Sequence, residues 1–239
     1  MTTIRIQVDD SATEQLWLEV GELAGKLPRE WVLVGGLMVQ LHALEHGVLD
    51  VRPTRDIDVL GQARPPGALQ AINKKLQADG FELVEPGFDG YGYRYERGGL
   101  IVDVLAPDGI KPPPALGRGV KAIGIPGGSQ ALARSELVTV QVRDVSFGLR
   151  RPTILGALLI KARSLMVHSD PASQREDLLR LLSLIDDPRQ LAGELRASER
   201  KWLAQAEHKL EFASPSLLET ELQRRAEVAF RLMLANHTS

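Results

Sequence analysis

Three aspartates carry the chemistry that this sequence could perform. Asp56 and Asp58 are two positions apart in the strand-like segment 55–60, so both carboxylates are expected on one face of it. Asp103 lies inside a second apolar strand segment, LIVDVLAP. Three converging carboxylates repel one another, which raises some of their pKa values unless a cation neutralises them. Because hard oxygen ligands suit magnesium, we predict that all three aspartates are metal ligands.

Gly35 and Gly36 are the second candidate feature. They follow the apolar run Trp31 to Val34 and precede a stretch whose apolar residues recur at helical spacing. Glycines at a strand-to-helix turn let the backbone approach a triphosphate, and they allow helix N-terminal amides to face it. The alternative interpretation of Gly-Gly is a plain tight turn. That of Asp-Ile-Asp is a pair of surface charges. The order of the two motifs, with a third aspartate in another strand, favours phosphate chemistry.

Together these residues predict the transfer of a phosphate-bearing group. In a two-metal arrangement, one magnesium ion activates the attacking hydroxyl and the other stabilises the leaving pyrophosphate. Asp56 and Asp58 would ligate metal, and Asp103 would complete the second site and help to deprotonate the acceptor.

The elements that must position these residues can be predicted from periodicity and turn signals. Ser11 and Glu14 fit a capping box, and Gly98-Gly99 fits the turn of a hairpin whose first strand carries Tyr91, Tyr93 and Tyr95 on one face. We expect helices over 11–27, 37–46 and 65–78 and strands over 31–34, 55–60, 81–85, 137–142 and 146–150. Residues 107–128 are expected to form an ordered loop.

From Thr153 onward the pattern is helical, with Asp187-Pro188 and Ser214-Pro215 predicted to open two helices. The predicted organisation is an α/β domain over residues 1–150 and a helical C-terminal domain over residues 151–239.

Composition limits the possible functions. The 239 residues include no Cys, which excludes a Cys nucleophile and a thiolate zinc site. A formal net charge of −2 argues against a broadly basic nucleic-acid-binding surface. The sequence has no membrane-length apolar run and its first residues do not read as a secretory signal, so a cytoplasmic location without membrane contact is expected.

The segment GGLMVQLHALEHGVLDVRPTRDIDVL resembles the opening of the DNA polymerase beta-like nucleotidyltransferase superfamily. In that superfamily a small-residue turn precedes a D-x-D strand, and a third acidic strand residue follows. The spacing of 19 residues between Gly36 and Asp56 is closer to the AbiEii/AbiGii-type nucleotidyltransferase toxins, whose R-x-T-x-D-x-D segment matches Arg52, Thr54, Asp56 and Asp58. The resemblance implies an α/β (α+β) nucleotidyltransferase fold with a mixed sheet, followed by an all-helical C-terminal domain.

The same family shows a later helical Lys, then a basic residue and an Asp that opens a further helix. Lys161, Arg175 and Asp177 follow in that order. The resemblance implies that Lys161 contacts phosphate and that Asp177 supports it, so that the nucleotide-binding set is Gly35, Gly36, Arg52, Thr54 and Lys161. The simpler interpretations are a solvated helix face for Lys161 and a charge near a helix N-terminus for Asp177. The sequence departs from the family in having Gly-Gly instead of Gly-Ser and in placing Glu176 between Arg175 and Asp177.

The leading hypothesis is therefore a magnesium-dependent enzyme that transfers NMP from a nucleoside triphosphate (NTP) to an acceptor hydroxyl. By resemblance, the acceptor is the 3′ end of a tRNA, and the protein is a toxin restrained by a separate antitoxin. The net charge of −2 suits a cationic small acceptor such as an aminoglycoside, which is the second hypothesis. The third is a nucleotide-binding module without turnover.

Two further groups of residues have plainer interpretations. His42 and His46 have a spacing that could bind metal, but they lack a third ligand and are read as ordinary helix residues. A scattered set of cations is either a local acceptor-binding patch or solvated surface: Arg94, Arg97, Lys111, Arg118 and Lys121.

Overall fold

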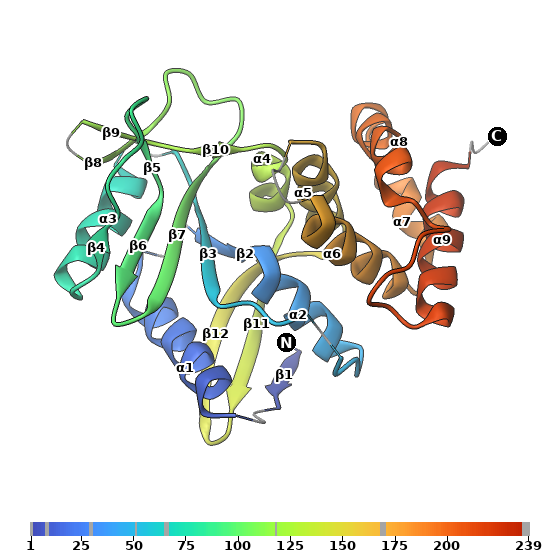
Figure 1. Cartoon of the computed structure of the whole chain (residues 1–239), viewed down its shortest axis with the longest axis horizontal. Helices are drawn as coiled ribbons and strands as arrows, with labels where there is room; N and C mark the ends of the chain where they lie inside the picture. Colours follow the sequence, from blue (N-terminus) through green and yellow to red (C-terminus); the bar gives the residue numbers. More distant parts are fainter. Residues whose placement is uncertain are drawn as a thin grey trace. The chain divides into compact units, whose positions relative to one another are not determined.

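The computed structural model describes residues 2–7, 10–28, 31–50, 52–64, 67–117, 119–167 and 171–235. The chain divides into two compact units, Met1–Thr153 and Ile154–Ser239 (Figure 1). In the described part of the first unit, strands β1 to β12 alternate with helices α1 to α4, whereas the described part of the second unit contains helices α5 to α9.

The central sheet of the first unit is mixed, as expected. Strand β3 pairs in parallel with β7, whereas β2 with β3, β6 with β7, and β4 with β6 pair antiparallel. The order is β2-β3-β7-β6-β4, with β10 pairing to the end of β7. The bounds are β2 Trp31–Val34, β3 Asp56–Gly61, β4 Glu82–Leu83, β6 Arg94–Arg97, β7 Leu100–Pro107 and β10 Gly124–Ile125.

Two smaller sheets were only partly predicted. The first comprises β1 (Thr3–Ile6), β11 (Ser135–Val142) and β12 (Val145–Pro152), of which β1 carries no signal that we used. The second comprises β5 (Tyr91–Gly92), β9 (Val120–Ala122) and β8 (Ala115–Gly117). The segment expected as a loop therefore contains short strands.

The prediction of three tyrosines on one strand is wrong. The chain leaves strand geometry at Tyr93, so that Tyr91 belongs to β5 and Tyr95 to β6, in different sheets. The hairpin between β6 and β7 is confirmed, because Arg97 pairs with Leu100 across the turn. Gly98 and Gly99 both have positive φ, which the type I′ two-residue hairpin turn requires.

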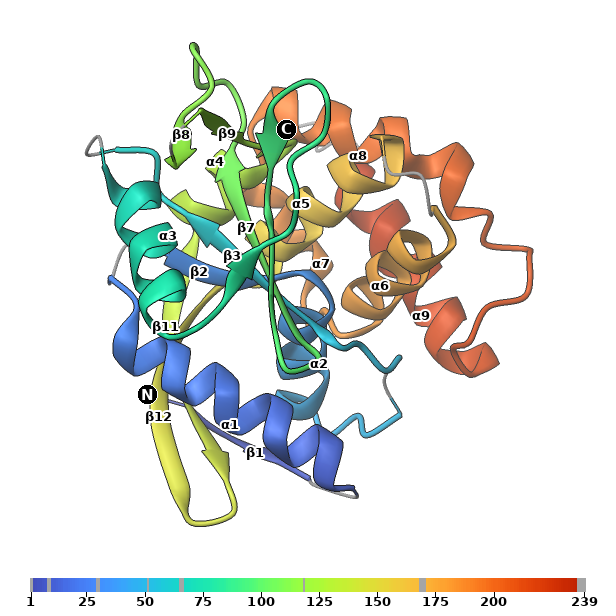
Figure 2. The ribbon, with the colours of Figure 1, turned by 60° about the vertical axis from the view of Figure 1, so that its left-hand side comes forward.

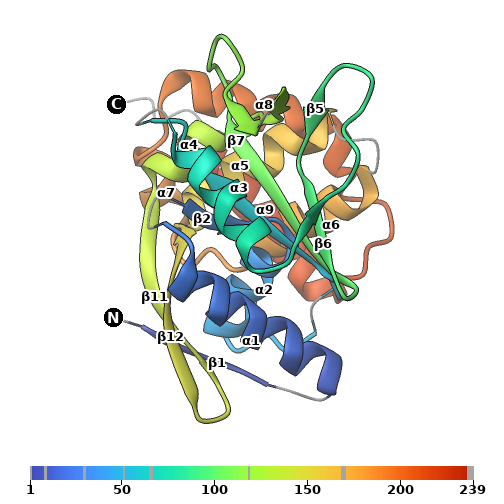
Figure 3. The same ribbon diagram turned by 90° about the vertical axis from the view of Figure 1, so that its left-hand side faces the viewer.

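The pleat of β3 and β7 separates an apolar face from an acidic one. Ile57 pairs with Val102 and Val59 with Val104, and all four side chains are buried in the core. Helix α3 (Ala68–Ala78) lies on this face of the sheet (Figure 3). Its Leu69 and Ile72 side chains lie against Gly61 at the end of β3. Alternation therefore directs the aspartates of both strands to the opposite face.

The remaining helices of the first unit are α1 (Ser11–Lys26), α2 (Gly35–Glu45) and α4 (Gly128–Ala133). The N-cap of α1 is Asp10 and not Ser11, because the Asp10 carboxylate accepts a hydrogen bond from the Thr13 backbone N–H at 2.8 Å. Helix α2 begins at Gly35 itself, so the glycine pair forms its first turn and does not precede it. Pro65 and Pro66, where helix α3 was expected to open, lie outside the described residues.

The second unit contains α5 (Ile154–Val167), α6 (Pro171–Ser183), α7 (Pro188–Gly193), α8 (Ala197–Leu210) and α9 (Thr220–Leu234). Asp187 caps α7 as predicted, accepting hydrogen bonds from two backbone N–H groups. The prediction that Ser214-Pro215 opens a helix is wrong, since α9 begins at Thr220. The carbonyls of Ser214 and Pro215 instead accept hydrogen bonds from Arg175. No helix in the described residues is long and apolar enough to cross a bilayer.

The burial of His42 on α2 can be tested by the dependence of folding stability on pH. Its side chain is 2% exposed, and Nε2 lies 3.0 Å from the Pro152 carbonyl oxygen. A carbonyl only accepts, so Nε2–H donates. Burial, followed by the nearby Arg151 cation, holds the His42 pKa well below its usual range. The folded state therefore resists protonation at this site.

We expect the stability conferred by neutral His42 to be complete above the unfolded-state pKa of about 6.5 and to be lost as pH falls below it. The free energy of unfolding, measured in urea from pH 7.5 to 5.0, should fall more steeply for the wild type than for His42→Gln, by up to about 1.4 kcal/mol per pH unit. Replacing the exposed His208 by Gln should leave the wild-type slope, and identical slopes for all three proteins would refute the assignment.

Candidate active site

The register of the central sheet gathers the three predicted aspartates. Strands β3 and β7 lie side by side (Figure 2). Asp58 pairs directly with Asp103 across them, and Asp56 lies two residues before Asp58. Paired residues of parallel neighbours point to the same face, so all three carboxylates share the face opposite the core. Asp103 is 6% exposed, whereas Asp56 and Asp58 are half-buried. The arrangement concentrates negative charge at one place on the sheet.

Arg94 on β6 is the cation that meets this charge. Its Nε donates to Asp103 Oδ1 at 2.9 Å and its Nη2 donates to Asp103 Oδ2 at 2.8 Å. The same Nη2 also reaches Asp56 Oδ2 at 3.3 Å. A bidentate contact between a guanidinium and a carboxylate is among the strongest side-chain hydrogen bonds. One guanidinium thus joins two of the three predicted ligands.

The electrostatics of Asp56 reflect its surroundings. Burial raises the pKa of the Asp56 carboxyl, and the neighbouring Asp103 charge raises it further. Arg94 and Arg52 act in the opposite direction, but the net pKa remains above its usual range. The burial of Asp56 and the charge of Asp103 thus outweigh the effect of the two nearby guanidinium groups on this carboxyl.

The third carboxylate, that of Asp58, leaves no room for a side chain at Gly35. The φ of Gly35 is +69°, and a Cβ added there would lie 1.7 Å from Asp58 Oδ2. The Asp58 carboxylate therefore rests directly against the first turn of α2, where helix amides lack intrahelical acceptors. Helix α2 has no acidic residue in its first turn. The glycine thus lets a strand carboxylate approach a helix N-terminus more closely than any side chain would permit.

The predicted Arg-x-Thr segment packs beside the same helix. A Cβ on Gly36 would lie 3.0 Å from Thr54 Cβ, so the second glycine makes room for the threonine. The Gln40 side chain, one turn further along α2, donates to the Arg52 carbonyl at 3.0 Å. The structure therefore brings the four predicted nucleotide-binding residues of the first unit together around the start of α2.

Lys161 and Asp177 form a pair within the second unit. Lys161 Nζ donates to Asp177 Oδ2 at 2.7 Å and to Gln174 Oε1 at 3.2 Å. The two charged residues are 5% and 4% exposed. Lys161 is thus not on a solvated face, and Asp177 lies well inside α6 and does not open it. Their mutual contact accounts for both burials.

Arg175 and Glu176 hold the segment that follows α8. Arg175 donates to the carbonyls of Leu210, Glu211, Ser214 and Pro215. Glu176 Oε2 accepts from the Leu217 backbone N–H at 2.9 Å. Glu176, which separates Arg175 from Asp177 in the sequence, therefore serves local structure.

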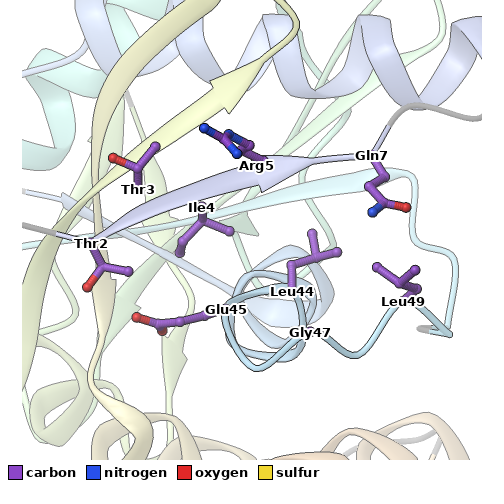
Figure 4. Close-up of a pocket in the computed structure, with 9 residues that line it drawn as sticks. All are labelled: Thr2, Thr3, Ile4, Arg5, Gln7, Leu44, Glu45, Gly47 and Leu49. Atoms are coloured by element: carbon purple, nitrogen blue, oxygen red, sulfur yellow. The ribbon is translucent and has the colours of Figure 1, made fainter.

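Two pockets among the described residues lie away from the aspartates. A pocket of about 530 Å³ lies between β1 and the C-terminal end of α2, where it is lined by Ile4, Arg5, Leu44, Glu45 and Leu49 among others (Figure 4). A second, of about 430 Å³, lies beyond the end of β7 around Asp108. Neither pocket is lined by any of the three aspartates.

Sequence reasoning missed the contact of Arg94 with Asp56 and Asp103, because it places Arg94 in a scattered set of five cations. Within that group Arg97 pairs with Glu19, and Arg118 lies outside the described residues. The signal was present: a two-residue turn at Gly98-Gly99 pairs Arg97 with Leu100, and counting back along both strands pairs Arg94 with Asp103. Register alone identifies the counter-ion.

Comparisons with known proteins support the fold. No family model and no curated protein sequence matches this chain. Among solved structures, an antigenic nucleotidyltransferase-like protein from Paracoccidioides brasiliensis is similar, with a TM-score of 0.52 and 14% identity over 90% of this chain and 93% of that one. The antibiotic-resistance factor ANT(2'')-Ia also matches, with a TM-score of 0.46 and 18% identity over 83% of this chain and 97% of that one.

Together, the fold and the site define a structural class for this protein. The mixed sheet, with acidic residues on β3 and β7 after a glycine-initiated helix, accompanies a fold similar to that of a nucleotidyltransferase-like protein.

Replacing Gly35 by Ala tests the close approach of Asp58. The left-handed backbone alone disfavours Ala by about 1–2 kcal/mol, and the added methyl must also displace the carboxylate. We expect the free energy of unfolding in urea to fall by at least about 2 kcal/mol. Gly25→Ala on α1 meets nothing within 4 Å and should be neutral or slightly stabilising. Equal effects of the two substitutions would contradict the proposed packing.

The Lys161 and Asp177 pair permits a second test. Lys161→Met leaves a buried carboxylate without its cation, so we expect a loss of about 3–5 kcal/mol in unfolding free energy. The double variant Lys161→Met, Asp177→Leu should recover most of that loss. Arg231→Met, which breaks an exposed pair with Glu227, should cost less than about 1 kcal/mol. The expectation fails if the single and double variants lose the same stability.

Proposed function

We propose that this protein is a magnesium-dependent nucleotidyltransferase that transfers NMP from an NTP to an acceptor hydroxyl and releases pyrophosphate. The observation that carries the proposal is the set of three carboxylates from β3 and β7 on one sheet face, beside the glycine-initiated N-terminus of α2. The similarity of the fold to a nucleotidyltransferase-like protein supports it.

The chemistry of the donor set fits magnesium. Asp56, Asp58 and Asp103 offer only hard oxygen ligands, and the three carboxylates together carry more charge than the one guanidinium bonded to Asp56 and Asp103. In the arrangement described, Arg94 stands between two of them, and no three acidic or imidazole side chains among the described residues form a ready metal cluster. The three aspartates would hold the metal, which would supply charge neutralisation for the phosphates and activation of the hydroxyl.

The chain's own residues supply positioning. The amides at the start of α2 would face the triphosphate, beside the Asp58 carboxylate and the Thr54 side chain that Gly35 and Gly36 admit. Arg52 and Thr54, beside that turn, would contact the nucleotide, and Asp103 would help to accept the proton of the acceptor hydroxyl. The hydroxyl oxygen forms a bond to the α-phosphorus as the bond to the β-phosphate oxygen breaks. Positioning of this kind accounts for most catalysis of phosphate transfer.

Lys161 and Asp177 enter the proposal through the sequence resemblance. In that interpretation the Lys161 ammonium would contact phosphate, with Asp177 supporting it. The buried ion pair between Lys161 and Asp177 supports the second part of this assignment, because Asp177 would orient the Lys161 ammonium.

The identity of the acceptor is proposed from the sequence. The Arg-x-Thr-x-Asp-x-Asp segment supports the 3′ end of a tRNA, which would make the protein a toxin with a separate antitoxin partner. The net charge of −2 supports a cationic small molecule, such as an aminoglycoside, as the second candidate. Parallel incubation with total tRNA and with an aminoglycoside panel, using each α-labelled NTP, distinguishes them by the species that becomes labelled.

Replacement of the aspartates tests the reaction itself. Asp56→Asn, Asp58→Asn and Asp103→Asn should each reduce label transfer by at least about 1,000-fold, since each removes a charge on which metal and phosphate binding depends. Circular dichroism should show that the fold is retained. Asp144→Asn, in the exposed turn between β11 and β12, should keep full activity.

Undiminished label transfer by the three Asn variants would contradict the proposed nucleotidyltransferase reaction. Binding of magnesium and nucleotide by the wild type without pyrophosphate release would instead support the module without turnover.

A further inference from the structure

We propose that Arg94 is the resident counter-ion of the Asp56 and Asp103 carboxylates, and that a divalent cation enters the site only by displacing it. The inference rests on the proposed function in one respect, namely that these carboxylates are metal ligands. It assigns to Arg94 the role of a positioning residue that keeps the acidic pair assembled when no metal is bound.

The first support is the oxygen atoms that Arg94 uses. Its two nitrogens engage both oxygens of Asp103 at 2.9 and 2.8 Å, and one of them also engages Asp56 Oδ2 at 3.3 Å. A magnesium ion joining the two residues would need oxygens from the same carboxylates at about 2.0–2.1 Å. The guanidinium and the ion would therefore compete for the same ligands, and their like charges would exclude simultaneous occupation at close range.

The second support is the balance of charge. Asp56, Asp58 and Asp103 share one sheet face, and Arg94 is the cation that both Asp56 and Asp103 contact. Arg52 also lies within electrostatic reach of Asp56. Three carboxylates facing two guanidinium groups still leave the site with a net negative charge, which attracts a further cation. A divalent ion would neutralise the site more fully than Arg94 does, so exchange is electrostatically favourable.

The third support is the freedom of Arg94 to leave. Its side chain is 34% exposed, whereas that of Asp103 is 9% exposed. Tyr95, the next residue along β6, is the one buried in the core, where its hydroxyl donates to Asn73 on α3, so the core packing of β6 does not depend on the Arg94 side chain. The Arg94 guanidinium also lies 5.8 Å from the Tyr93 ring. The cation can therefore move while the carboxylates remain anchored on their strands.

Direct measurement of metal binding without nucleotide tests the proposal. Isothermal titration of the full-length protein with Mg²⁺ and Mn²⁺ should give an affinity for Arg94→Gln at least about tenfold tighter than for the wild type, because the competing cation is gone. Arg94→Lys, which keeps the charge but cannot make the bidentate contact, should lie between them. Arg143→Gln, which removes an arginine paired with Glu14 far from these aspartates in the sequence, should bind metal as the wild type does.

Thermal unfolding provides the second readout. Without metal, Arg94→Gln should unfold at a lower temperature than the wild type, and added Mn²⁺ should raise its midpoint by more than it raises that of the wild type. Adding Asp103→Asn to Arg94→Gln should abolish the tighter binding, which locates the ion at this site. If Arg94→Gln proves unfolded, the metal affinity of Arg94→Lys relative to the wild type tests the proposal instead.

Weaker or unchanged metal affinity in Arg94→Gln and Arg94→Lys would overturn the competition and make Arg94 a support for bound metal. If that result accompanies metal-dependent label transfer by the wild type, only this inference fails. Absence of both metal binding and label transfer would remove the proposed function as well.

Discussion

The first unit depends on one constraint: the strand register that closes its core also collects negative charge on the opposite sheet face. Ile57, Val59, Val102 and Val104 are buried through the parallel pairing of β3 with β7. The same pairing sets Asp58 beside Asp103, and a slip of one residue would exchange the two faces. Hydrophobic burial therefore holds the acidic cluster together against its own repulsion. Arg94 and the start of α2 then reduce that repulsion from two sides.

Two ion pairs of this chain, Lys161 with Asp177 and Arg94 with Asp56, differ in their exposure to solvent. Lys161 and Asp177 are both almost fully buried, so separating them would leave a buried charge without its opposite charge. Arg94 and Asp56 are each about one-third exposed, so water can replace either partner. The first pair is suited to fixing the packing of its helices. The second is suited to exchange of the cation. Exposure, more than hydrogen-bond distance, distinguishes the two.

Much of the fold was predictable where periodicity and turn chemistry agree. The strand at Trp31, the helix at Ser11, the Gly98-Gly99 hairpin and the cap at Asp187 were all predicted from local signals. Predictions failed where long-range contacts decide. Strand β1 exists because it pairs with β11, more than a hundred residues away, and Ser214 is held out of a helix by Arg175. Local propensity contains no information about such partners.

The sequence by itself determined the residue types of the candidate site and the face on which Asp56 and Asp58 lie, because strand alternation is a local property. It also contained the hairpin register that places Arg94 opposite Asp103. Only the tertiary structure decided that β3 and β7 are parallel neighbours, that Asp58 lies against Gly35, and that Arg94 reaches Asp56. These contacts join segments distant in the chain, and their geometry follows from how the sheet and its helices bury their apolar faces together.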